Sequence, residues 1–135
     1  MGSAGMIGLI SDTHGLMRQE ALTALSGSDL IIHAGDVGKP EIIEQLRALA
    51  PVVAVRGNID KGPWASRLPV TAVAEARSAL IYILHDIQQL DLAPRAAGFN
   101  IVVSGHSHRT LWRDVFESRE CRPSALSVAY NRCAS

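Results

Sequence analysis

Short apolar runs alternate with amphipathic segments in the first half of the chain. The runs have the length of buried strands, and the segments between them carry apolar side chains at the spacing of a helix. Because a strand–helix–strand order joins parallel strands through right-handed crossovers, the pattern predicts a parallel sheet covered by helices. The predicted strands are residues 6–11, 29–33 and 51–55, and the predicted helices are residues 17–25 and a segment that begins at Pro40.

The second half of the chain is richer in strand-like runs. One helix is predicted over residues 88–97, although Pro94 interrupts its pattern. Two of the strand-like runs lie close enough together to form a β-hairpin with a short turn. The predicted strands are residues 70–75 and 79–84, which form that hairpin, and residues 100–104 and 111–116.

The end of the chain shows neither a helical nor a strand period. Scattered polar and small residues dominate from residue 117 onward, and no linker or internal repeat precedes them. We therefore predict one domain over residues 1–116, followed by an atypical C-terminal tail over residues 117–135.

Composition narrows the classes of protein to which the chain can belong. Lys plus Arg and Asp plus Glu number 13 each, which argues against a basic nucleic-acid binder and a polybasic membrane-surface protein. With 47% hydrophobic and 19% charged residues, the chain has the composition of a folded domain. Its apolar runs fall far short of the roughly 20 residues of a membrane span. Cys121 and Cys133 are too few for a disulfide framework, so we expect a cytoplasmic protein. From the balanced charge and the short apolar runs, we expect neither a nucleic-acid nor a membrane partner.

Side chains with metal-binding atoms follow five of the predicted strands, at the point where each strand ends. Sites in open α/β sheets form at the carboxyl ends of the strands, so we expect these side chains to meet at one rim. Asp, Asn and His supply the oxygen and nitrogen atoms that hold divalent metal ions. Each alone has an ordinary structural explanation, such as a helix cap or a buried imidazole. The residues are Asp12, His14, Asp36, Asn58, His85, His106 and His108.

The order of these residues along the chain is more specific than any one of them. The motifs are Asp-x-His at 12–14, Gly-Asp at 35–36, Gly-Asn-x-Asp at 57–60, His85, and Gly-His-x-His at 105–108. In this order they resemble the calcineurin-like metallophosphoesterase family, and within it the small bacterial and archaeal phosphodiesterases. The resemblance implies an α/β fold, a four-layer αββα sandwich with its metal site at the carboxyl ends of the strands.

The resemblance also implies two divalent metal ions, each held by its own set of side chains. Asp36 would bridge the two ions, and we predict Asp36, Asn58 and His106 as the catalytic residues among the ligands. Manganese is the expected ion, and the same ligand types also admit iron, nickel, zinc or cobalt. Asp12, His14 and His108 would hold the first ion, and Asn58, His85 and His106 the second.

The charges of such a site favour phosphate binding. Two dications bring four positive charges, of which Asp12 and Asp36 cancel two and a bridging hydroxide cancels a third. About one positive charge remains to attract a phosphate group. The bridging hydroxide is the expected nucleophile, since a bound metal ion lowers the pKa of water to about 7.

Residues around the asparagine of the Gly-Asn motif modify this expectation. Many relatives have a histidine after it that protonates the leaving group, whereas this chain has Ile59, which has no proton to donate. Because general acid catalysis is worth about 10²–10⁴-fold, we expect modest turnover and substrates whose leaving group departs without strong acid help. We expect Arg56 to contact the substrate phosphate, Asp60 to act as a turn or capping residue, and His33 to support the site without binding metal.

The tail departs from the family pattern. Relatives continue after Gly-His-x-His with a hairpin and an Asn-Pro-Gly-Ser turn, which is absent here. We expect C-terminal strands of the fold to be missing, as after a truncation or a change of reading frame near residue 117. Such a loss would expose the edge of a sheet.

The sequence thus predicts a dinuclear metal-dependent phosphoesterase, more specifically a phosphodiesterase, that acts on a small phosphate ester. The alternative is a non-catalytic metal-binding scaffold of the same fold. The complete ligand set favours the enzyme, while the missing acid and the altered tail favour the scaffold. A nuclease is disfavoured by the neutral net charge, since grooves that follow a nucleic-acid strand are basic. Formation of a homo-oligomer is left open.

Overall fold

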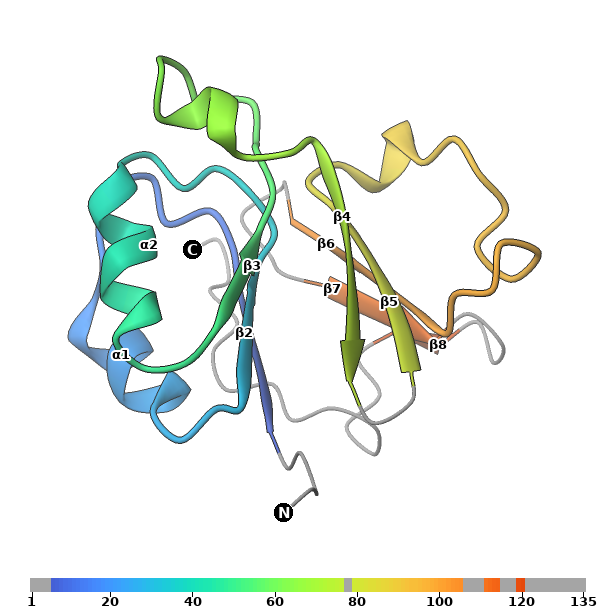
Figure 1. Ribbon diagram of the computed structural model, residues 1–135, viewed down its shortest axis with the longest axis horizontal. Coiled ribbons are helices and arrows are strands. Elements are labelled where there is room, and N and C mark those ends of the chain that lie inside the picture. The colour runs from blue at the N-terminus through green and yellow to red at the C-terminus, as the bar shows by residue number, and fades with distance from the viewer. Residues whose placement is uncertain (1–5, 77–78, 106–110, 115–118, 121–135) are drawn as a thin grey trace.

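Two β-sheets stacked face to face form the centre of the molecule (Figure 1). The computed structural model describes residues 6–76, 79–105, 111–114 and 119–120. Within these residues, two helices cover the outer face of one sheet and an irregular segment covers the outer face of the other. The predicted α/β sandwich is confirmed.

The first sheet is the parallel sheet predicted from the first half of the chain. Its three strands are β1 (Ile7–Ile10), β2 (Leu30–His33) and β3 (Val52–Ala54), paired in the order β1-β2-β3. The helices α1 (Gln19–Leu25) and α2 (Pro40–Arg47) connect them. α2 begins at a proline, whose fixed φ suits the first turn of a helix.

The second sheet has five strands in the order β4-β5-β6-β7-β8. The predicted hairpin is confirmed as the antiparallel pair β4–β5, and β5 pairs in parallel with β6. β7 and β8 continue the sheet by antiparallel pairing. The strands are β4 (Thr71–Ala76), β5 (Ala79–Leu84), β6 (Ile101–Ser104), β7 (Leu111–Asp114) and β8 (Arg119–Glu120).

The core follows from the alternation of side chains along the strands. Successive residues of a strand point to opposite faces of its sheet. Leu9 of β1 therefore packs between the two sheets with Ile81 and Ile83 of β5, while its neighbour Ile10 packs beneath the helices. All four side chains are essentially inaccessible to solvent, so an aliphatic core fixes the two sheets against each other.

The outer face of the second sheet is covered by an irregular segment, and the helix predicted over residues 88–97 is wrong. The segment contains only a short 3₁₀ helix, η2 (Ile87–Gln89), followed by turns. Pro94 has no N–H to donate, and the apolar side chains of the segment reach the sheet without a regular helical period. Ile87, Leu90, Leu92 and Phe99 pack against Tyr82, Leu84 and Val102.

The C-terminal strands extend further than the sequence pattern indicated. The strand predicted over residues 111–116 is confirmed as β7, and β8 follows inside the segment predicted as an atypical tail. Residues 115–118 and 121–135 lie outside the described residues, so the domain boundary at residue 116 and the missing terminal strands stay predictions. Of the helices that the structure describes, none is long and apolar enough to cross a membrane.

Candidate metal centre

Three predicted metal ligands meet where the first two strands end. Asp12 and His14 follow β1, and Asp36 follows β2. The Nε2 atom of His14 lies 3.4 Å from Oδ2 of Asp36 and 3.9 Å from Oδ1 of Asp12. One ligand atom of each residue lies within 4.8 Å of the others, close enough for a shared cation. Two carboxylates and an imidazole are suitable donors for a divalent metal ion.

The backbone is left-handed at the same three positions. Asp12, His14 and Asp36 have φ angles of 56°, 52° and 59°, and they are the only non-glycine residues with positive φ in the described part of the chain. This conformation costs side-chain-bearing residues free energy and persists where the surrounding structure enforces it, often at functional sites. Here, the N–H groups of Asp12 and His14 donate to the carbonyls of Gly35 and Asp36, at 2.9 and 3.0 Å. The two loops are thereby joined, and their three ligands point to one place.

His85 reaches the same cluster from the second sheet. It directly follows β5, and its Nε2 atom lies 3.4 Å from Oδ1 of Asp36. Its Nδ1 atom is 2.8 Å from the carbonyl oxygen of Ala34, which only accepts hydrogen bonds, so Nδ1 carries a proton. This contact orients the ring with Nε2 toward Asp36, as a metal ligand would require.

Asp36 and His85 shift each other's protonation. Burial raises the pKa of Asp36, but hydrogen bonds from His85 and the Ile59 N–H outweigh it and lower the pKa to about 2. Burial lowers the pKa of His85, but hydrogen bonds to Asp36 and to the Ala34 carbonyl outweigh it and leave the pKa raised. The contact between Asp36 and His85 thus favours the carboxylate form of Asp36 and the protonated form of His85 relative to the isolated side chains.

At two glycines of the predicted motifs, a neighbouring residue approaches too closely to leave space for a side chain. A Cβ atom on Gly57 would overlap the backbone N and Oδ1 of Asp36. Gly35 has a φ of 103°, and a Cβ atom there would lie 2.6 Å from Nδ1 of His85. The glycines of the Gly-Asp and Gly-Asn motifs therefore make room for His85 and Asp36, two of the predicted ligands.

His33 supports the site, as expected, without reaching the ligand cluster. It is completely buried, and its Nδ1 atom accepts a hydrogen bond from the Gly35 N–H at 3.1 Å. Nε2 lies 3.0 Å from the hydroxyl oxygen of Thr13, which itself donates to the Val37 carbonyl at 2.9 Å. Burial and the neighbouring His85 lower the pKa of His33 to about 3, so the ring is neutral. It links the loop after β1 to the loop after β2.

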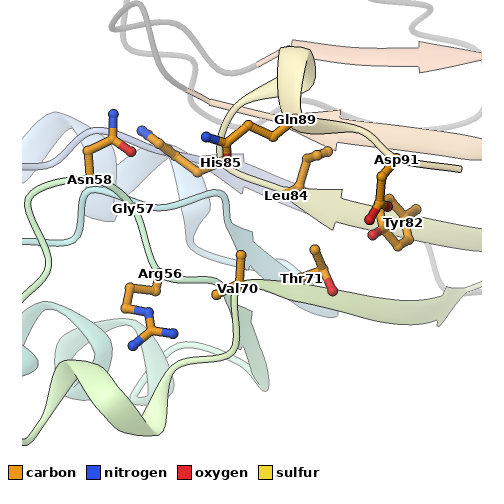
Figure 2. Close-up of a pocket in the computed structure, with 10 residues that line it drawn as sticks. All are labelled: Arg56, Gly57, Asn58, Val70, Thr71, Tyr82, Leu84, His85, Gln89 and Asp91. Carbon is orange, nitrogen blue, oxygen red and sulfur yellow. The ribbon is translucent and has the colours of Figure 1, made fainter.

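A cavity of about 350 Å³ opens beside His85 and Asn58. Figure 2 shows these two side chains at one end of the cavity lining. Arg56 also lines the cavity, and its guanidinium group points away from Asn58 and His85 in this view. The other lining residues come from β4, β5, η2 and the segments next to them. The complete lining is Arg56, Gly57, Asn58, Val70, Thr71, Tyr82, Leu84, His85, Gln89 and Asp91.

Comparison with known proteins identifies the family. The model of the calcineurin-like phosphoesterase superfamily domain matches residues 6–126. The chain belongs to this superfamily. It is 30% identical over 135 residues to a probable metallophosphoesterase of Methanothermobacter thermautotrophicus, covering 91% of this chain and 78% of that protein. It is 36% identical over 141 residues to one of Methanocaldococcus jannaschii, covering 95% of this chain and 71% of that protein. The chain is therefore a member of a family of metal-dependent phosphoester hydrolases.

Solved structures share the fold of this metallophosphoesterase. A Vps29 structure from Entamoeba histolytica matches with a TM-score of 0.60 and 24% identity, covering 76% of this chain and 64% of that chain. An archaeal phosphodiesterase matches with a TM-score of 0.61 and 17% identity, covering 84% of this chain and 96% of that chain. The metallophosphoesterase thus spans less than two thirds of the Vps29 chain and nearly all of the archaeal phosphodiesterase.

The structure describes five of the seven predicted ligands of the metallophosphoesterase. Asp12, His14, Asp36 and His85 converge, and Asn58 lines the cavity beside His85. The remaining two, His106 and His108, lie outside the described residues.

One supporting residue has a larger role than the turn or cap expected from the sequence. Oδ2 of Asp60 accepts hydrogen bonds from the N–H groups of Val37 and Gly57, at 3.1 and 2.8 Å, and Oδ1 accepts one from Gly38 at 2.8 Å. Asp60 is only 5% exposed. It joins the loop that carries Asp36 to the loop that carries Asn58. The hydrogen bond from the Gly57 N–H could be expected from the sequence, because Asp60 lies three residues after this glycine. The bonds from Val37 and Gly38 could not, because these residues approach Asp60 only in the folded chain.

Proposed function

We propose that the chain is a dinuclear metal-dependent phosphodiesterase. The observation that carries the proposal is the position of Asp36 between two imidazoles. Its Oδ2 atom faces His14 and its Oδ1 atom faces His85, each at 3.4 Å. A carboxylate with one oxygen toward each of two ligand groups suits a bridge between two ions. The proposal extends the family membership, which supports metal-dependent phosphoesterase activity.

The donor set fits the proposed metal ions. Asp12, His14 and Asp36 would hold one ion, and Asp36, Asn58 and His85 the other, with His108 and His106 completing the two sets. When bound, the ions would supply a hydroxide nucleophile at neutral pH and neutralise charge on the phosphoryl oxygens. Manganese is our proposed ion among the divalent metals that these ligands admit.

The protein's own groups hold the site in place. The hydroxyl of Ser11 donates to Oδ2 of Asp12 at 2.6 Å, and the Ile59 N–H donates to Oδ1 of Asp36 at 3.1 Å. These bonds restrict the rotation of both carboxylates, so neither must reorganise when a cation binds. Arg56 lies on the same cavity, and a change of rotamer would bring its guanidinium group toward a bound phosphate.

The side chain beside Asn58 supports a preference for diesters with good leaving groups. Ile59 is 44% exposed and carries no titratable group where many relatives have a histidine. We propose that the leaving oxygen takes its proton from solvent or from the substrate, which limits the reaction to alcohols that leave readily. A small phosphate ester is the proposed substrate, and a cytoplasmic location stays a prediction from composition.

Hydrolysis of two aryl esters tests the function. Purified protein is assayed on bis-(p-nitrophenyl) phosphate and on p-nitrophenyl phosphate, with added Mn²⁺ and after treatment with a chelator. We expect release of p-nitrophenol from the diester, dependence on the metal, and slower release from the monoester. Folded, metal-loaded protein that hydrolyses neither ester would favour the non-catalytic scaffold. Faster turnover of the monoester would contradict the preference for diesters.

A further inference from the structure

The cavity beside the metal centre carries opposite charges at its two ends. Asn58 and His85 lie at one end, on the same side of the view as the positive Arg56. Asp91 lies at the opposite end of the view, and Tyr82 lines the cavity on the same side of the view. Leu84, which is almost fully buried, lies between the two ends. With the proposed metal ions bound at the Asn58 and His85 end, a molecule that fills this cavity would meet positive, apolar and negative surroundings in turn.

The carboxylate at the far end is held there by its neighbours in the chain. Leu90 and Leu92 flank Asp91, and both pack into the apolar cluster around Tyr82 and Leu84. Because the two leucines anchor the backbone on the sheet, the side chain between them stays at the cavity rim. The Asp91 side chain is exposed, so its carboxylate lies at the solvent-facing rim of the cavity.

We propose that this cavity binds the amino-alcohol part of a zwitterionic phosphodiester. The inference rests on the proposed function, which places the phosphate at the metal end. A short alkyl chain would then cross the apolar middle of the cavity, and its ammonium group would meet Asp91. A carboxylate only accepts hydrogen bonds, so it pairs with an ammonium group and repels a second phosphate or carboxylate. Tyr82 lines the same cavity, and its hydroxyl oxygen would offer the ammonium group a further hydrogen-bond acceptor.

The size of the cavity agrees with a small head group. Its volume of about 350 Å³ is at the lower end of the roughly 300–1,000 Å³ typical of small-molecule sites. An aminoethyl group fits such a space, whereas a long acyl chain would extend into solvent. The carboxylate of Asp91 would attract the ammonium group of an amino alcohol, whereas a neutral polyol of the same length carries no charge to pair with it.

A series of diesters with one leaving group tests the charge at the far end. The manganese-loaded protein is assayed on p-nitrophenyl phosphodiesters whose second alcohol is methanol, ethylene glycol or ethanolamine. We expect the kcat/KM of the aminoethyl ester to exceed that of the hydroxyethyl ester about fivefold, the size of a partly exposed ion pair. Asp91→Asn should lower the ratio of aminoethyl to hydroxyethyl turnover to about one. Glu75→Gln removes an exposed carboxylate of β4 that does not line the cavity, and it should leave the ratio unchanged.

Binding measurements separate this inference from the proposed reaction. Titration calorimetry compares 2-aminoethyl phosphate with ethyl phosphate, using the wild type and Asp91→Asn. If no diester is hydrolysed but the wild type binds the aminoethyl compound more tightly and Asp91→Asn does not, the cavity assignment stands and the reaction is wrong. If the diesters are hydrolysed with equal kcat/KM and Asp91→Asn changes no ratio, the cavity assignment is wrong and the reaction stands.

Discussion

Nε2 of His85, at the end of β5, lies 3.4 Å from Oδ1 of Asp36, at the end of β2, so a contact between an imidazole and a carboxylate connects the two sheets of the sandwich. The ring of His85 is also bonded to the Ala34 carbonyl in the loop after β2. The candidate metal centre is therefore assembled from both sheets, and substitutions can alter the residues that either sheet contributes.

Replacement of Asp36 by Asn should weaken both proposed ions at once. The amide removes the negative charge and places an NH₂ group where one of the two facing oxygens now lies. We expect a loss of manganese affinity and of kcat of about 100-fold or more, beyond the 10–100-fold typical of changes around ligands. Calorimetric titration with Mn²⁺ and the diester assay measure the two effects. Glu44→Gln, on the exposed face of α2, is the matched control, and an Asp36→Asn variant with full activity would exclude the bridging role.

Replacement of Asp60 by Asn should loosen the two loops that it joins. The NH₂ group of asparagine donates hydrogen bonds and cannot accept them. At least one of the three backbone N–H groups that now donate to Asp60 therefore loses its acceptor. We expect the free energy of unfolding to fall by about 2–3 kcal/mol, the range for hydrogen bonds to a carboxylate in a buried setting. Urea denaturation measures this change, and titration with Mn²⁺ should show a weaker site as well. A variant as stable as the wild type would show that these bonds contribute little.

Two glycine substitutions separate crowding at the metal centre from backbone strain. Gly57→Ala places a methyl group against Asp36, so we expect loss of metal affinity. Gly98→Ala meets nothing within 4 Å but has a φ of 95°, so we expect a stability cost of about 1–2 kcal/mol with metal affinity unchanged. Manganese titration and urea denaturation of both variants check the pair. Equal metal affinities in the two variants would contradict the close approach of Gly57 to Asp36.

The buried His33 should make the fold sensitive to mild acid. Its pKa in the folded protein is about 3, below the 6.5 of an unfolded histidine, so between these values the unfolded chain binds more protons. The stabilisation is complete above pH 6.5 and is lost as the pH falls toward 3, at up to about 1.4 kcal/mol per pH unit.

Comparison of the wild type with His33→Gln isolates this effect. The free energy of unfolding is measured with a chelator present between pH 7 and pH 5, above the range in which Asp36 titrates. We expect the wild type to lose more stability than the variant over this range. If the free energy of unfolding fell equally with pH in the two proteins, protonation of His33 would not destabilise the fold, and the prediction would be wrong.

The strands, and the convergence of four of the predicted ligands, could be predicted from the sequence because they depend on local pattern. Runs such as residues 6–11 are apolar because both faces of the strand are covered, and the ligands follow strand ends because the crossovers bring those ends together. The segment over residues 88–97 was mispredicted because its apolar side chains are selected by contacts with β5 and β6 instead of by a helical period. The bonds of Asp60 to the β2 loop span 22 and 23 residues of sequence, so no local pattern indicates them.

The aliphatic layer between the sheets acts as a spacer for the metal ligands. Stacked sheets lie about 10 Å apart, a distance set by the side chains that fill the gap. Ile32 of β2 and Ile83 of β5 are both fully buried in that layer, close in sequence to Asp36 and His85. A change in the volume of either isoleucine would shift one ligand relative to the other. We therefore expect the affinity of the candidate site for metal ions to depend on hydrocarbon side chains that no ion touches.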